Sequence, residues 1–117
     1  MDTTEYHLNW AVQLRRGWLE LCVLNALQGG ERYGYNLVRA LAALPGLDVT
    51  EGTLYPLLSR LRLTGLVATR LEESSAGPAR KYYALTPQGR RELARMNEHV
   101  ETMVAQSRRL SGSKERT

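Results

Sequence analysis

The chain has 117 residues, of which 43% are hydrophobic and 24% are charged, and this is the size and composition of one folded domain rather than of a disordered chain. Its formal net charge of +4 suits a polyanionic partner without selecting one. No run approaches the roughly 18 apolar residues of a membrane span, and the polar start at residues 1–9 is unlike a signal peptide, so we expect a cytoplasmic protein without a membrane partner.

The first predicted helix runs from Trp10 to Leu27, where apolar residues recur three or four positions apart. Its second half is apolar nearly all round, so we expect it to be buried on more than one side. Gly29 and Gly30 end this helix, because glycine adopts the left-handed cap conformation at little cost.

Two shorter helices are predicted next. The second helix spans residues 33–44 and ends before a Pro-Gly pair. The third has Thr50 as its expected N-cap, carries an inward stripe of leucines and closes at Gly65. Counted from this cap, Pro56 lies beyond the first turn and would cost a hydrogen bond, so we expect the regular helix to begin nearer residues 52–53.

A β-hairpin is predicted after the third helix. Apolar and polar residues alternate over residues 66–71, and a tyrosine-rich stretch at residues 81–85 predicts the second strand. Residues 74–78 between them have turn-forming chemistry. We therefore expect a two-stranded hairpin with a loose tip and with Arg80 and Lys81 beside it.

The last predicted helix spans residues 86–110, with Thr86 as its cap and Pro87 as its first residue. Its apolar residues form a narrow heptad seam, which needs another helix beside it. Together with the doubly apolar first helix, this seam predicts a homodimer. The expected dimerisation residues are Leu14, Leu21, Leu93, Met96, Val100, Met103 and Val104. Residues 111–117 are polar and are expected to form a flexible tail.

The order helix, helix, helix, hairpin, helix is the plan of a winged helix-turn-helix, a mainly α fold with a small β-hairpin. We assign residues 1–85 to a winged-helix DNA-binding domain that includes the N-terminal helix, and residues 86–110 to a C-terminal dimerisation helix. In this plan the third helix enters the major groove and the hairpin is the wing. Winged-helix domains also serve as protein-interaction modules, so the surface has to decide the function.

The surface expected for the third helix suits a DNA groove. Arginine can form a bidentate fork with guanine, hydroxyl groups can bind bases or phosphates, and tyrosine can reach the backbone. The expected outward residues are Thr53, Tyr55, Pro56, Ser59, Arg60 and Arg62. Eight basic and three acidic residues lie between Arg60 and Arg95, which concentrates positive charge in the helix and wing region.

Two runs in this region carry a family resemblance: EGTLYPLLSRL at residues 51–61 and GPARKYYALTPQG at residues 77–89, with YGY at residues 33–35 matching as well. They resemble the PadR family of bacterial transcriptional regulators, and the resemblance covers roughly residues 14–110. It implies a homodimeric repressor that binds a pseudo-palindromic operator in double-stranded DNA and releases it when an effector binds. With one C-terminal helix, the chain resembles the short subclass.

The resemblance also implies residue roles. By motif match, the positions expected to contact DNA are Thr53, Tyr55, Pro56, Ser59 and Arg60 on the helix, Arg80 and Lys81 on the wing, and Tyr33, Tyr35 and Asn36 at phosphates. Short PadR-like dimers hold flat aromatic effectors with tryptophan at a central pore, which implies a small hydrophobic effector at Trp10 or Trp18. Here both tryptophans lie on the first helix, so ordinary packing in the core or the dimer stays open.

Metal, cofactor and catalytic functions have no support in the sequence. Cys22, His7 and His99 are not spaced as metal ligands, and a lone cysteine in an apolar run is expected to be a buried thiol in a reducing compartment. No phosphate-binding loop, catalytic triad order or acid pair is visible, so we expect no cofactor and no enzymatic activity. The alternatives to a repressor are a protein-interaction module and a sequence-neutral DNA-binding protein.

Overall fold

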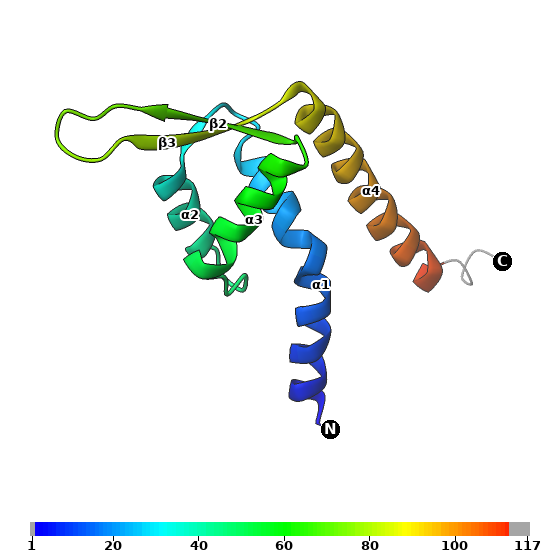
Figure 1. Cartoon of the computed structure of the whole chain (residues 1–117). Helices are drawn as coiled ribbons and strands as arrows, with labels where there is room; N and C mark the ends of the chain where they lie inside the picture. The colour runs from blue at the N-terminus through cyan, green and yellow to red at the C-terminus, as the bar shows by residue number, and fades with distance from the viewer. Residues whose placement is uncertain (1, 113–117) are drawn as a thin grey trace.

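The computed structural model describes residues 2–112 and contains four helices and three strands in this range. In chain order they are α1 (Thr3–Ala26), β1 (Arg32–Tyr33), α2 (Gly34–Ala42), α3 (Glu51–Leu63), β2 (Val67–Glu72), β3 (Arg80–Leu85) and α4 (Pro87–Gly112). The predicted fold, mainly α with a small hairpin on a winged-helix plan, is confirmed (Figure 1). Among the described residues, no helix is both long and apolar enough to cross a membrane.

Several predicted boundaries differ from those of the structure. Helix α1 begins at Thr3, well before Trp10, and the Asp2 side chain caps it by accepting a hydrogen bond from the Glu5 backbone N–H at 2.8 Å. The early turns of α1 were missed because they face no core and therefore carry no apolar period. At the other end, α4 continues to Gly112, so the first two residues of the expected tail are helical, and the rest of that tail lies outside the described residues.

Thr50 is the N-cap residue of helix α3, as predicted, although its side chain forms no cap hydrogen bond. The expected delay of the regular helix to residues 52–53 was wrong, because α3 begins at Glu51 and contains Pro56. Pro56 has no N–H to donate to the carbonyl of Gly52, four residues earlier. Both residues are exposed, so water can reach that carbonyl, while the buried leucines of the opposite face hold the helix in place.

The hairpin is part of a three-stranded antiparallel sheet in the order β1-β3-β2. Strand β1 has two residues, too few to show an alternating pattern, and was not predicted. Its Tyr33 lies opposite Tyr82 of β3, which in turn lies opposite Arg70 of β2. Beyond the body of the molecule, β2 and β3 continue as a long ribbon, the wing (Figure 1).

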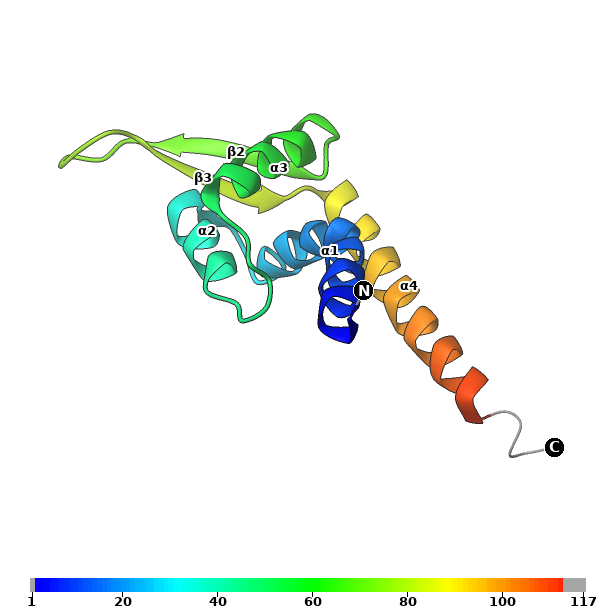
Figure 2. The same ribbon diagram turned by 90° about the horizontal axis from the view of Figure 1, so that it is seen from below.

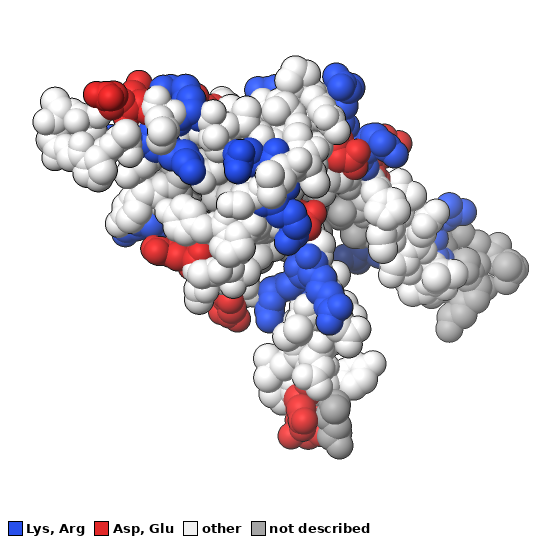
Figure 3. All heavy atoms as spheres, in the orientation of Figure 1, with Lys and Arg blue, Asp and Glu red and all other residues white. Residues whose placement is uncertain are grey.

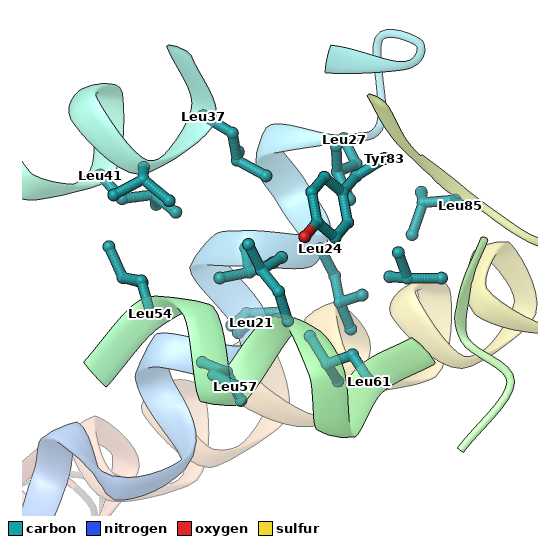
Figure 4. Close-up of a cluster of buried hydrophobic side chains, with 14 of the residues drawn as sticks. Leu21, Leu24, Leu27, Leu37, Leu41, Leu54, Leu57, Leu61, Tyr83 and Leu85 are labelled. Carbon is teal, nitrogen blue, oxygen red and sulfur yellow. The ribbon is translucent and has the colours of Figure 1, made fainter. Parts of the chain in front are cut away.

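The core lies where α1, α2, α3 and the sheet converge. Leucines from the three helices meet there, and the ring of Tyr83 points in among them from β3 (Figure 4). Leu24, Leu37 and Leu54 are fully buried. Helix α3 is thereby fixed by four buried leucines, and its remaining side chains are left to face solvent.

Helix α4 is attached to this body at its first turn. The Thr86 hydroxyl donates to the Gly65 carbonyl at 2.6 Å and accepts from the Gly89 backbone N–H at 2.9 Å, which confirms the predicted cap. A Cβ at Gly89 would lie 2.0 Å from the Leu66 carbonyl oxygen. The close approach of α4 to the chain before β2 therefore requires glycine at this position.

Beyond this seat, α1 and α4 form the two arms of a V. The side-chain amides of Asn25 and Asn97 exchange two hydrogen bonds, at 3.0 and 3.2 Å, near the vertex. From there the N-terminal half of α1 and the C-terminal half of α4 leave the body and diverge (Figures 1 and 2). The chain is accordingly elongated, with extents of 66 × 35 × 21 Å.

Candidate nucleic-acid interface

The exposed surface of α3 has two flanks and a ridge between them. Each residue advances about 100° around a helix, and with the leucines facing inward, Pro56 and Ser59 lie on the ridge, opposite the core. Tyr55 lies on the flank toward α2 and the sheet, and Arg60 lies on the flank toward α1. Thr53 shares the flank of Arg60, and all five side chains are exposed.

Arg60 is engaged with α1. Its Nη2 donates to Oε1 of Glu20 at 2.5 Å, and both side chains are partly exposed. An exposed ion pair of this kind contributes little to stability and is readily exchanged. Arg60 can therefore leave Glu20 for an acceptor on DNA, but it has to break this pair first.

Tyr55 belongs to a group of tyrosines at the junction of α2, α3 and the sheet. Desolvation raises the pKa of its phenol, and the nearby Glu51, Tyr33 and Tyr35 raise that pKa further. The ring centroids of Tyr33 and Tyr35 are 6.1 Å apart. Tyr33, Tyr35 and Tyr55, the three tyrosines expected to touch DNA, are thus brought together from β1, α2 and α3.

Gly34 allows this junction to close. A Cβ at Gly34 would lie 2.7 Å from Cε1 of the buried Tyr83 ring, so the first turn of α2 can pack against β3 only without a side chain. Tyr35 and Asn36 follow directly and are exposed beside the sheet. The glycine of the YGY run therefore has a packing reason, and it sets the position of its two exposed successors.

The wing separates the two basic residues that the sequence placed together. Successive strand residues face opposite sides of a sheet, so Lys81 shares the face of Tyr83 and Leu85, whereas Arg80 lies on the other face. There the Arg80 guanidinium lies 5.1 Å from the ring centroid of Tyr33. A hollow of about 460 Å³ opens beside it, lined by Glu31, Arg32, Tyr33, Asn36, Arg80 and Tyr82.

Two basic residues of this surface were not among the predicted sites. Arg32 lines the hollow beside Arg80. Arg39 packs over the Tyr35 ring at 5.6 Å and donates from Nη1 to its hydroxyl at 3.4 Å. The sequence held a signal for both residues. Arg39 follows Tyr35 by four positions on one helix, so the two side chains are expected to meet, and Arg32 directly precedes the YGY run.

Basic side chains also gather around the residues expected to contact DNA. On the face shown in Figure 3, Lys and Arg side chains gather over the sheet, α3 and the middle of α1, while Asp and Glu lie more toward the margins. A surface of this kind attracts a polyanion and keeps its hydrogen-bond donors exposed.

A second hollow lies between the two arms, helices α1 and α4. This groove of about 760 Å³ is lined by apolar and charged side chains, among them Leu14, Trp18, Met96, His99, Val100 and Met103. Trp10 is not part of the lining and instead lies 5.9 Å from the His7 ring. Of the two tryptophans named as candidate effector contacts, only Trp18 lines this groove.

The expected dimerisation residues need one correction. Leu21 and Leu93 are 5% and 2% exposed within the single chain and belong to its own core, so they have almost no surface to offer a partner. Leu14, Met103 and Val104 are exposed, and Met96 and Val100 are half-buried.

Among residues 2–112 no cluster of three potential metal ligands occurs, and burial raises the pKa of the Cys22 thiol.

The model of the PadR-like family of transcriptional regulators matches residues 23–95, which include α2, α3 and the whole wing. The chain belongs to this family. Members of this family are DNA-binding transcriptional regulators.

Individual relatives of the chain support the same family assignment. The chain is 34% identical over 87 residues to the transcriptional regulator YqjI of Escherichia coli, covering 73% of this chain and 40% of that protein, so it spans about two fifths of the relative's length. It superimposes on a PadR family regulator from Eggerthella lenta with a TM-score of 0.78 and 33% identity, over 92% of this chain and 93% of that one. A PadR-like regulator from Bacillus cereus gives 0.73 and 35%, over 84% and 95%.

Proposed function

We propose that this PadR-like regulator is a repressor that binds a pseudo-palindromic operator as a homodimer and is released by a small hydrophobic effector. The observation that carries the proposal is the division of the surface. Exposed donors from α2, α3 and the wing surround one junction, and exposed apolar side chains line the arms α1 and α4. One surface suits a polyanion, and the other suits a second copy of the chain.

The proposed roles follow from this geometry. Pro56 and Ser59 on the ridge of α3, with Thr53, Tyr55 and Arg60 on its flanks, would meet base edges in the major groove. Tyr33, Tyr35, Asn36, Arg80 and Lys81 would bind phosphates on either side and fix the register of the helix. In a two-fold dimer the recognition helices would lie about 34 Å apart, which matches one turn of DNA.

A gel shift with the DNA upstream of the chain's own gene tests the proposal, since small regulators often bind their own promoter. We expect a dissociation constant of about 10⁻⁸ M or tighter for that fragment and much weaker binding to a scrambled fragment of equal length. Equal binding to both would favour a sequence-neutral DNA-binding protein. No binding to either would favour a protein-interaction module.

Lys81→Ala tests the phosphate contacts of the wing, with Arg108→Ala on α4 as a control that removes the same charge elsewhere. We expect Lys81→Ala to weaken operator and scrambled DNA alike and to reduce the slope of log K against log salt by about 0.9, the effect of one phosphate contact. Arg108→Ala should leave that slope nearly unchanged. Equal slopes in both variants would remove Lys81 from the interface.

A further inference from the structure

One face of the sheet carries a continuous row of two tyrosine rings between two guanidinium groups. Tyr33, Tyr82 and Arg70 are cross-strand neighbours on β1, β3 and β2. The two rings lie 5.7 Å apart, and the Arg70 guanidinium lies 4.6 Å from the centroid of Tyr82. Arg80 lies 5.1 Å from the centroid of Tyr33 and ends the row on the other side. Such contacts between cations and rings, and between neighbouring rings, are attractive.

Glu31 anchors the Arg70 end of this row. Arg70 Nε donates to both carboxylate oxygens of Glu31, at 2.9 and 3.2 Å, and its Nη2 donates to Oε1. Its Nη1 lies 3.4 Å from Oε1 of Glu72. The hydrogen bonds from Arg70 lower the pKa of the Glu31 carboxyl. Glu31 lies in the loop before β1, so this bidentate pair ties the wing to the body of the domain.

The two arginines of the row are therefore in different states. The donors of Arg70 are occupied by Glu31 and Glu72. Arg80, by contrast, makes no hydrogen bond or ion pair within residues 2–112, although its flat face rests on Tyr33. Arg32 and Asn36 line the hollow next to it. The donors of Arg80 are therefore exposed to solvent beside this hollow.

We propose that Glu31 and Arg70 are positioning residues that hold the wing against β1 and so keep Arg80 over Tyr33 in the geometry that binds a DNA phosphate. This inference rests on the proposed function, because it concerns how the same surface engages DNA. It assigns Arg70, a basic residue on the wing, to an internal pair rather than to DNA. It also assigns a binding role to an acidic residue at the edge of a basic surface.

The sign of the effect of Glu31→Gln tests the proposal. A carboxylate that merely lies near DNA repels it, so its neutralisation should tighten binding. A positioning carboxylate should have the opposite effect: we expect Glu31→Gln to weaken operator binding about three- to tenfold and to reduce the salt slope by about 0.9, as the Arg80 contact is lost. Glu73→Gln, at the exposed end of the wing, is the matched control and should bind DNA equally well or more tightly.

Two further variants show whether Glu31 acts through Arg70 and Arg80. In an Arg80→Ala background, Glu31→Gln should have no additional effect, because the contact that it positions is already gone. The exchange Glu31→Arg with Arg70→Glu should restore most of the affinity that either single change removes. In the free protein, the Nε–H resonance of Arg70 should lose the ring-current shift from Tyr82 in Glu31→Gln.

The outcomes separate this inference from the proposed function. Operator binding by the unaltered protein together with equal or tighter binding by Glu31→Gln would overturn the positioning role alone. An Arg70→Gln variant that loses one phosphate contact while Glu31→Gln keeps all of them would assign Arg70 to DNA directly and would also overturn it. No operator-selective binding by the unaltered protein would overturn the proposed function and this role with it.

Discussion

The two halves of the molecule bury their apolar side chains differently. In the winged-helix half, the leucines of α2 and α3 meet those of α1 within one chain, and several are fully buried. On the two arms, large apolar side chains stay exposed: Trp10 is 51% exposed and Met103 is 56% exposed. Large exposed apolar patches are typical of protein–protein contact sites. The comparison shows that one half completes its core within the chain, whereas the arms leave large apolar side chains exposed, as the proposed dimer requires.

The largest effect should come from the point that joins the two halves. Replacing Gly89 with alanine would bring a Cβ to 2.0 Å from the Leu66 carbonyl oxygen, and a backbone atom cannot move aside as a side chain can. We expect a loss of about 3 kcal/mol or more in the free energy of unfolding, measured by denaturant titration.

Gly17→Ala is the control for that measurement. Gly17 is also helical, but an added Cβ would meet nothing within 4 Å. Alanine in a helix interior is favoured over glycine by roughly 0.5–1 kcal/mol, so this variant should be more stable than the parent chain. A Gly89→Ala variant as stable as the parent would mean that α4 is not seated against Leu66.

The next effect concerns the arms alone. Met103→Glu places a charge on the exposed seam of α4, and we expect a dimer that becomes monomeric at low micromolar concentration while its unfolding cooperativity is retained. A two-fold dimer loses two methionines at once, one from each protomer, which at about 2 kcal/mol each corresponds to about 4 kcal/mol of association free energy, or roughly a thousandfold weaker dimer. Analytical ultracentrifugation measures this change directly.

Ala105→Glu introduces the same charge on the opposite side of α4, at an exposed position, and should leave the association unchanged. A parent chain that is already a folded monomer at low micromolar concentration would contradict the dimer, and the two-fold operator with it. Dissociation by both variants would place the interface elsewhere on α4.

Much of the winged-helix half could be predicted from the sequence, because its elements carry their own signals. The leucine period of α3, the cap at Thr86 and the alternation in β2 each depend on neighbours in the chain. Strand β1 gave no signal, since two residues define no period and their pairing with β3 is decided by the tertiary fold. Leu21 and Leu93 were assigned to the dimer because apolar periodicity does not distinguish a core from an interface.

The candidate site shows the same limit. The sequence identified Tyr33, Tyr55 and Arg80 by motif, but it could not show that the three come from elements packed together. Nor could it reveal Glu31, since its partner Arg70 is 39 residues away. Long-range ion pairs have no local pattern, and they become visible only once the strands are in register.

The winged-helix half can be tested at Arg60. Arg60→Ala should weaken operator binding by about 1–3 kcal/mol and relax specificity at one base pair, if the arginine reads a base. We expect a value near the lower end, because Arg60 must first leave Glu20. Operator binding to single-base variants in a fluorescence titration measures both quantities. A uniform loss across all base variants would assign Arg60 to a phosphate instead.

The smallest expected effect is a loss of operator affinity when a ligand binds in the groove between α1 and α4. Trp18 lines this groove and is 41% exposed, whereas Trp10 lies outside the lining. We expect flat hydrophobic dyes or phenolic acids to quench tryptophan emission in the parent chain and in Trp10→Phe, but not in Trp18→Phe.

A ligand that favours a different angle of the arms would change the spacing of the recognition helices, and by linkage it must then weaken operator binding. Glu20, further along the same helix, pairs with Arg60, so a shift of α1 would reach α3 directly. Quenching that survives in Trp18→Phe, or that leaves operator affinity unchanged, would reduce Trp18 to a packing residue of the dimer.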